Sequence, residues 1–242
     1  MHNTPPYFIN GMHRITINII GAGGTGSLIV TKLARLNKAL NELEHPGFYV
    51  NLIDYDIIEN NNIGRQMFTE NNIGEFKADV VISNINRAFN LDWDTKLRPF
   101  VPETDCYSNI VISCVDNVST RENILDSFYD DKKGYNNDVS TKYYLIDCGN
   151  ARDFGQVILS DYNKELKNIN DIAPNWKKQD TEEEQGAGCS YLDSLSKQDL
   201  FVNDWVSLFA VNMIKELIFD KRINYQGVFF NSKECLTQKM KL

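Results

Sequence analysis

A glycine-rich turn, IIGAGGTGS at residues 19–27, constrains the fold more than any other feature of this chain. It follows an apolar run at 15–20, which predicts a short buried strand. Apolar residues then recur at helical spacing from 25 to 43, until Pro46 and Gly47 end the segment. A second strand is predicted at 48–53. Strand, turn, helix and strand in this order indicate a crossover between parallel strands.

The rest of the chain continues this alternation. We predict helices at 77–89, 120–129 and 200–219, and strands at 96–101, 109–115, 143–148, 156–159 and 228–230. This order predicts an α/β fold, a Rossmann-like, doubly wound and mostly parallel sheet with a C-terminal antiparallel extension. The helix at 200–219 is apolar around most of its circumference, so it is either a central core helix or a subunit interface.

Length and composition suit one domain over residues 1–242, with a nucleotide-binding core at 15–160, a polar crossover loop at 161–190 and a C-terminal helix and strands at 191–242. No apolar run approaches the ~20 residues of a membrane span. The N-terminus lacks the basic-then-apolar order of a signal peptide, so we expect a cytoplasmic protein. The net charge of −8 is spread without a basic stripe, which argues against nucleic-acid binding.

Cysteine and histidine usage argues against a zinc site. The five cysteines form no C-x-x-C pair, as a reducing compartment allows, so we expect no structural zinc. The three histidines, His2, His13 and His45, are too scattered for a histidine-based metal cluster.

The glycine turn supplies four candidate nucleotide-binding residues, Gly21, Gly23, Gly24 and Gly26. Without a Cβ atom, backbone can approach phosphate oxygens closely, and the helix that follows points free N–H groups at the anion. Tight packing alone is the alternative explanation for the glycines. Asp54 ends the second strand, where an acidic residue is expected to bond ribose hydroxyls.

The next loop, DYDIIENNNIGRQ at 54–66, contains Asn62, Arg65 and Gln66, and Lys77 opens the following helix. A nicotinamide site needs a stacking surface and little further positive charge. A triphosphate attacked at its α-phosphorus needs cations at its β and γ groups, which Arg65 and Lys77 supply. The alternatives are a surface ion pair for Arg65 and a solvated helix start for Lys77, although the helix dipole makes lysine mildly unfavourable there.

Asp116, in SCVDN at 113–117, follows an apolar strand at the end where a ligand is expected. A lone carboxylate would repel a polyphosphate unless a cation lay between them. Mg²⁺ binds through one or two carboxylates plus substrate phosphates, so Asp116 is the candidate metal ligand. Capping of the following helix is the alternative.

Taken together, GAGGTGS, DYD-x5-NIGRQ, the lysine after NIGEF and SCVDN-x3-R resemble the ThiF/MoeB and ubiquitin-activating enzymes over residues 15–121. HPG, NINRAFNLDW and CSYLDSLSKQDLF resemble the ThiF-family component of the PRTRC cassette of bacterial mobile elements. The resemblance implies a dimeric adenylyltransferase that activates the C-terminal carboxylate of a ubiquitin-like protein with ATP and Mg²⁺. It also implies a conjugating-enzyme-like protein as a partner.

By the same resemblance, Asp54 would hold the ribose, Asn62, Arg65 and Lys77 the phosphates, and Asp116 the magnesium, with Gln66 completing the nucleotide site. Cys189 lies where such enzymes place a cysteine that forms a thioester with the activated tail. The acidic residues of EEEQGAGC would raise the pKa of that thiol, and a structural cysteine is the alternative.

Two features depart from the family pattern. The paired C-x-x-C motifs that bind zinc in several members are absent. The N-terminal segment INGMHRI matches poorly the RYxRQ-like segment whose arginine reaches the partner subunit's ATP, so Arg14 is a weak counterpart. The other four cysteines, Cys106, Cys114, Cys148 and Cys235, are expected to be structural.

Four functions follow in order of preference. The first is adenylation of a protein carboxyl terminus. The second is adenylation of a small molecule or a tRNA, which the acidic charge disfavours for tRNA. The third is a non-catalytic ATP-binding scaffold for plasmid-maintenance proteins. A dehydrogenase comes last.

Overall fold

A mixed eight-stranded sheet forms the centre of the protein, in the order β10-β9-β7-β6-β5-β2-β3-β4. The computed structural model describes residues 1–64, 66–130, 142–177 and 199–242. Five neighbouring strands are parallel: β4 (Asp94–Lys96), β3 (Phe48–Ile53), β2 (Ile15–Ile20), β5 (Ile110–Ser113) and β6 (Tyr144–Asn150). Three antiparallel strands extend the sheet: β7 (Phe154–Asp161), β9 (Tyr225–Asn231) and β10 (Leu236–Lys241). The predicted fold class is confirmed.

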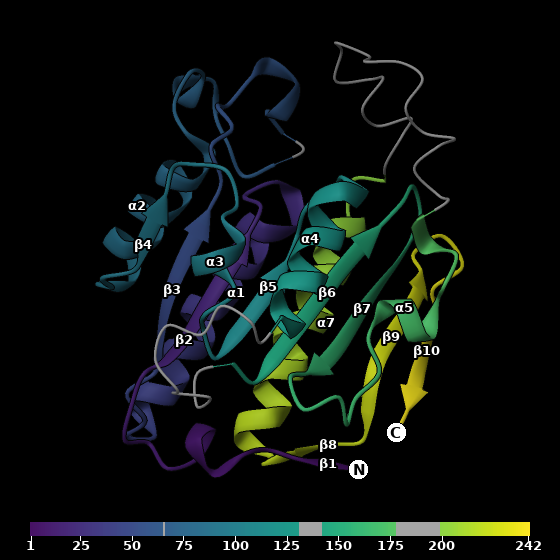
Figure 1. Ribbon diagram of the computed structural model, residues 1–242. Helices are drawn as coiled ribbons and strands as arrows, with labels where there is room; N and C mark the ends of the chain where they lie inside the picture. The colour runs from purple at the N-terminus through teal and green to yellow at the C-terminus, as the bar shows by residue number, and fades with distance from the viewer. Residues whose placement is uncertain (65, 131–141, 178–198) are drawn as a thin grey trace.

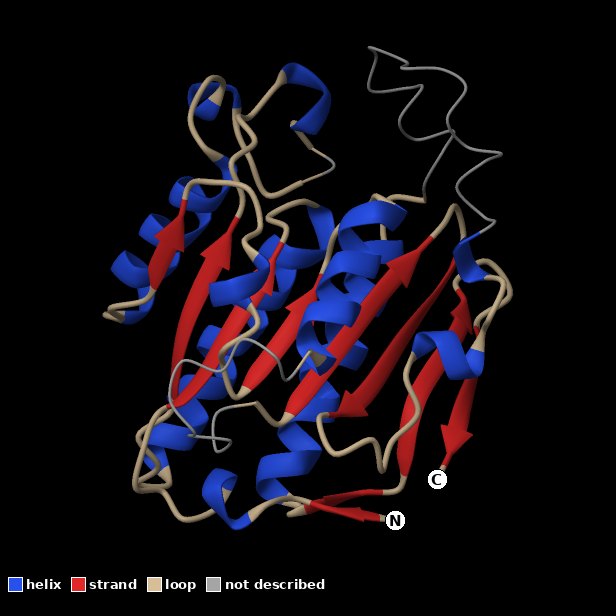
Figure 2. Ribbon diagram, viewed as in Figure 1, coloured by secondary structure: helices blue, strands red, loops and turns tan. Residues whose placement is uncertain are grey.

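Helices cover both faces of this sheet (Figures 1 and 2). One face carries α1 (Gly24–Glu42), α2 (Lys77–Phe89) and α7 (Val202–Phe219). The other carries α3 (Pro102–Asp105), α4 (Val118–Tyr129) and α5 (Ile169–Ile172). Short 3-10 turns lie at Pro6–Phe8, Asn60–Asn62 and Glu70–Asn72, and a separate two-stranded ribbon pairs β1 (His2–Asn3) with β8 (Arg222–Ile223).

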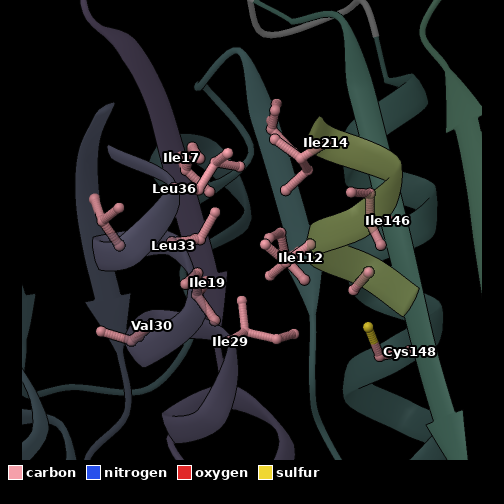
Figure 3. Packing of buried hydrophobic residues seen from close by; sticks show 14 of the residues in the cluster. Ile17, Ile19, Ile29, Val30, Leu33, Leu36, Ile112, Ile146, Cys148 and Ile214 are labelled. Carbon is pink, nitrogen blue, oxygen red and sulfur yellow. The ribbon is translucent and has the colours of Figure 1, made fainter. Parts of the chain in front are cut away.

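The larger core forms because the central strands are apolar on both faces, as a doubly covered parallel sheet requires. Ile17 and Ile19 of β2 are fully buried, and Figure 3 shows them in one cluster with Ile29 and Leu33 of α1. Ile214 of α7 is also fully buried and belongs to the same cluster. The predicted core role of the helix at 200–219 is therefore confirmed.

The strand predicted at 96–101 is wrong beyond Lys96, because the next residues wrap a buried carboxylate instead. Asp105 accepts hydrogen bonds from Lys96 Nζ at 3.0 Å, from Arg98 at 2.7 and 2.8 Å, and from the Val101 amide at 2.8 Å. Burial alone would raise the pKa of Asp105, but these bonds lower it to about 2. The charge cluster thus ends β4 early.

The segment expected to be a polar crossover loop, 161–190, contains regular secondary structure at its start. Strand β7 continues to Asp161, α5 follows, and Ile169 and Trp176 are buried in the smaller core cluster. Residues 178–198 of that segment lie outside the described ranges. Strand β10, LTQKMK, was not predicted because it is an exposed edge strand with no apolar run.

Candidate functional site

The predicted nucleotide-binding residues lie where the parallel strands end. The glycine turn follows β2, Asp54 follows β3, and Asp116 lies three residues after β5 ends. Because β2, β3 and β5 run in the same direction side by side, their carboxyl ends lie at the same end of the sheet (Figure 1). Open α/β sheets bind ligands outside these ends.

Three of the four glycines are explained by packing inside the protein. A Cβ atom on Gly21, where φ is +101°, would lie 2.6 Å from the Cys114 carbonyl oxygen. A Cβ on Gly26 would lie 1.9 Å from the Gly21 oxygen, and one on Gly24 would lie 2.4 Å from Asn203 Nδ2. At these three positions, internal packing is sufficient to require a glycine.

Gly23 differs from the other three glycines. A Cβ atom placed there would have no atom within 4 Å, so internal packing does not require this glycine. Gly23 is the N-cap residue of α1, and no side chain caps the helix. The first N–H groups of a helix have no intrahelical acceptor, which makes an uncapped start a binding place for anions. The open space at Gly23 leaves room for an anion such as a phosphate to approach the backbone.

Asp54 fixes the glycine turn from the neighbouring strand. Its Oδ2 accepts a hydrogen bond from the Ala22 amide at 2.5 Å, and its Oδ1 accepts one from the Asp56 amide at 2.7 Å. Burial raises the pKa of Asp54, and the two amide bonds oppose that shift. Each carboxylate oxygen has a second lone pair, so the residue retains capacity for ribose hydroxyls.

Lys77 is the first residue of α2, as predicted, but its ammonium group is not solvated. The side chain is 11% exposed, and Nζ lies 3.0 Å from Asp56 Oδ2. The Lys77 amide also donates to the Asp56 carbonyl at 2.9 Å. The solvated-start alternative is therefore wrong, because the Lys77 side chain is largely covered, pairs with Asp56 and lies close enough to influence the Asp54 carboxyl.

Asn62 and Gln66 lie within the loop that connects β3 to α2. Asn62 is buried, and its Oδ1 accepts from the Glu59 amide at 2.9 Å, which closes a reciprocal capping box around the 3-10 turn. Gln66 Oε1 is buried and has no hydrogen-bond partner among the described residues. An unpaired buried acceptor is costly, so this amide fits a ligand or a water that donates to it.

Asp116 is exposed and does not cap α4. The cap is its neighbour Asn117, whose Oδ1 accepts from the Thr120 amide at 2.8 Å. The capping alternative is therefore wrong for Asp116, because Asn117 is the residue that caps α4. Within the described ranges, no group of three or more histidine, cysteine or acidic side chains could hold a metal. Asp116 fits Mg²⁺ as a single protein ligand that shares the ion with phosphates.

An ion pair between α4 and β6 was missed. Arg121 of α4 donates from Nε to Asp147 Oδ1 at 2.7 Å and makes a second bond to Asp147 Oδ2. Its guanidinium carbon lies 4.6 Å from the centre of the Trp176 ring. The pair fixes α4 against β6 near the carboxyl end of the sheet. The aspartate within the apolar run YYLIDC was the available signal, because a buried charge requires a partner.

A second missed group joins three elements at the glycine turn. Thr25 of α1 donates to Asn203 Oδ1 at 2.9 Å, and Asn150 at the end of β6 donates to both residues, at 3.1 and 2.6 Å. These residues are far apart in the sequence, and no local pattern connects them.

The remaining candidate residues differ in exposure and in the contacts that they make. Arg65 and Cys189 lie outside the described residues. Arg14 forms a surface ion pair with Asp92, at 2.5 and 2.8 Å, and this pair raises its pKa. Cys106 is buried, which raises the pKa of its thiol to about 12. Cys235 is exposed between β9 and β10, so it does not pack as a small hydrophobic side chain.

Similar folds occur in solved structures. Escherichia coli MccB with ATP has a TM-score of 0.65 at 17% identity, and the match covers 98% of this chain and 66% of MccB. MccB with selenomethionine-substituted MccA gives 0.64 at 17% identity, with the same coverages. PaaA gives 0.65 at 14% identity, covering 98% of this chain and 76% of PaaA. At these identities the likeness shows the fold alone.

The chain spans just under two thirds of MccB, since 66% of MccB is covered. No curated protein matches the sequence. In the described ranges, no helix is both long enough and apolar enough to cross a membrane. The profile of the ThiF family matches residues 8–191, which is more than half of the chain. The protein therefore belongs to the ThiF family.

Proposed function

We propose that this protein is an ATP-dependent adenylyltransferase that activates the C-terminal carboxylate of a small ubiquitin-like protein. The observation that carries the proposal is the position of Lys77. A largely buried lysine, held by Asp56, places positive charge close to the Asp54 carboxyl, which is the ribose candidate. Such a cation suits a triphosphate, whose charged phosphates need neutralising when the α-phosphorus is attacked.

The comparisons support this direction. The chain belongs to the ThiF family, and the similar structures include MccB with ATP and MccB with MccA. A ubiquitin-like substrate, a conjugating-enzyme-like partner, a homodimer and the PRTRC subtype are our proposals from the motifs in the sequence. We also propose a single domain that works in the cytoplasm.

The chemistry needs positioning more than proton transfer. A carboxylate oxygen attacks the α-phosphorus of ATP and pyrophosphate leaves, so no general base is required. The first-turn N–H groups of α1 would hold phosphate oxygens, and Asp54 would orient the ribose. Lys77, with Arg65, would neutralise the β and γ groups, while Asn62 would donate a neutral hydrogen bond.

A magnesium ion, when bound, supplies further neutralisation of the phosphates. Asp116 would be its protein ligand, because this carboxylate is exposed after the end of β5 and is not used as a helix cap. Transfer of the activated tail to Cys189, with release of AMP and formation of a thioester, is the second step that we propose.

The test begins with calorimetric titration of the full chain with Mg·ATP and, separately, with NADH. We expect magnesium-dependent binding of ATP, no binding of NADH, and weaker magnesium dependence in Asp116→Asn. Pyrophosphate exchange into ATP should then require a small β-grasp protein from the same gene cluster. Binding of NADH alone would contradict the proposal, and ATP binding without exchange with any such partner would leave only a scaffold function.

A further inference from the structure

The start of α1 is attached to the rest of the protein by three polar side chains. Thr25, Asn150 and Asn203 come from α1, β6 and α7, and their mutual distances are 2.6, 2.9 and 3.1 Å. Thr25 and Asn203 are buried. Asn203 Oδ1 accepts from both of the other residues, so it is the centre of this triad.

The triad takes up the one side-chain hydroxyl in the sequence GAGGTG. Thr25 has the only hydroxyl in GAGGTG, and this hydroxyl donates to Asn203 instead of reaching toward the open space at Gly23. The Asn203 amide also fills the position that a Cβ on Gly24 would take, at 2.4 Å. Asn203 thus touches two successive residues in the first turn of α1.

A second contact connects the start of α7 to the turn between β6 and β7. The Asp199 amide, just before α7, donates to the Arg152 carbonyl in the turn between β6 and β7 at 2.7 Å. The start of α7 is therefore bonded both to the β6–β7 turn and to the glycine turn. Helices α1 and α7 lie side by side on the same face of the sheet (Figure 1), so this junction sits at one end of their shared interface.

We propose that Thr25 and Asn203 are positioning residues that fix the first turn of α1 in the orientation that binds triphosphate. This inference rests on the proposed function. Three of the residues around Thr25 are glycines, whose backbone has more conformations to lose than that of other residues. A turn that is already ordered loses less entropy when it binds a ligand. Removing the triad should therefore lower the affinity for ATP.

The experiment compares Thr25→Val, which keeps the shape and removes the hydroxyl, with Thr25→Ser, which keeps the hydroxyl. The Kd for Mg·ATP is measured by calorimetry for the full chain, with the thermal midpoint measured in parallel. We expect about tenfold weaker binding for Thr25→Val and for Asn203→Ala, as the loss of a buried hydrogen bond predicts, and near-normal binding for Thr25→Ser. The double variant Thr25→Val with Asn203→Ala should bind no more weakly than Asn203→Ala alone.

Asn212→Ala is the matched control, because Asn212 lies on the same helix and bonds Glu216 and Tyr225 at a distance from the glycine turn. It should lower the thermal midpoint and leave the Kd unchanged. Wild-type affinity in Thr25→Val, or additive losses in the double variant, would overturn the positioning role while the proposed function stands. Failure of the wild-type chain to bind Mg·ATP would overturn both.

Discussion

The Asp54 carboxylate accepts a hydrogen bond from the Ala22 amide at 2.5 Å, which joins the end of β3 to the glycine turn after β2. Its second oxygen accepts from the Asp56 amide at 2.7 Å. Both bonds require an acceptor on each oxygen, which a carboxylate has and a carboxamide lacks. Asp54 therefore shapes the glycine turn in addition to any contact with a ribose.

Replacing Asp54 with asparagine should weaken both the fold and the nucleotide site. One of the two amide donors loses its acceptor, so we expect the free energy of unfolding to fall by about 1–3 kcal/mol. The Kd for Mg·ATP should rise at least about tenfold, which is the effect of losing one such interaction. Urea unfolding and calorimetry measure the two effects. Asp126→Asn, on the exposed face of α4, should change neither, and an unaffected Asp54→Asn would refute this role.

Alanine at two of the glycines should separate nucleotide binding from folding. Gly26→Ala forces a Cβ to within 1.9 Å of the Gly21 oxygen, so we expect a loss of about 1–3 kcal/mol or more in unfolding free energy. Gly23→Ala meets no atom of the protein within 4 Å, so the fold should keep its stability. Its methyl group would occupy the space that fits a phosphate, and ATP binding should be lost. Thermal unfolding measures the stability of both variants, and calorimetry measures their binding of ATP. Normal ATP binding by Gly23→Ala would contradict a phosphate site at the start of α1.

The parts of the site that were predictable are those set by neighbours in sequence. The apolar runs at 15–20 and 48–53 predicted the bounds of β2 and β3, and the glycine turn comes directly after the first of these runs. Asp54 and Lys77 could be located because each lies at the end of a predicted element. Parallel strands bring their carboxyl ends together at one edge of the sheet, whatever the structure of the segments that connect them.

The parts that were missed depend on contacts between distant segments. Asn203 meets Thr25 across 178 positions, and no periodicity marks an asparagine inside an apolar helix as the partner of a glycine turn. Asp116 and Asn117 are adjacent and both suit a helix cap, so only geometry could show that Asn117 takes this role. Asp105 ends β4 through bonds to three residues, which sequence spacing does not reveal.

Lys77→Met should separate phosphate binding from nucleoside binding. Methionine keeps most of the buried stem and removes the charge that lies 3.0 Å from Asp56. If the ammonium group neutralises the β and γ phosphates, the Kd for ATP should rise while the Kd for AMP stays unchanged. The rate of pyrophosphate exchange should fall by about 100-fold or more, the usual cost of losing one preorganised electrostatic contact.

Lys38→Met is the control for this substitution, because Lys38 forms an exposed pair with Glu42 on α1. It should leave ATP binding, AMP binding and exchange unchanged. Equal loss of ATP and AMP affinity in Lys77→Met would assign the lysine to the nucleoside instead of the phosphates.

Asp105 should make the fold sensitive to acid. Its folded pKa of about 2 lies below the value of about 3.9 in unfolded chains, so its ionised form stabilises the fold above the unfolded pKa. As pH falls from about 4 to about 2, about 2 kcal/mol of unfolding free energy should be lost. Urea titrations across this range should show a shallower pH dependence in Asp105→Asn. The exposed pair of Asp92 and Arg14 contributes little, so Asp92→Asn should keep the wild-type slope; an unchanged slope in Asp105→Asn would refute the prediction.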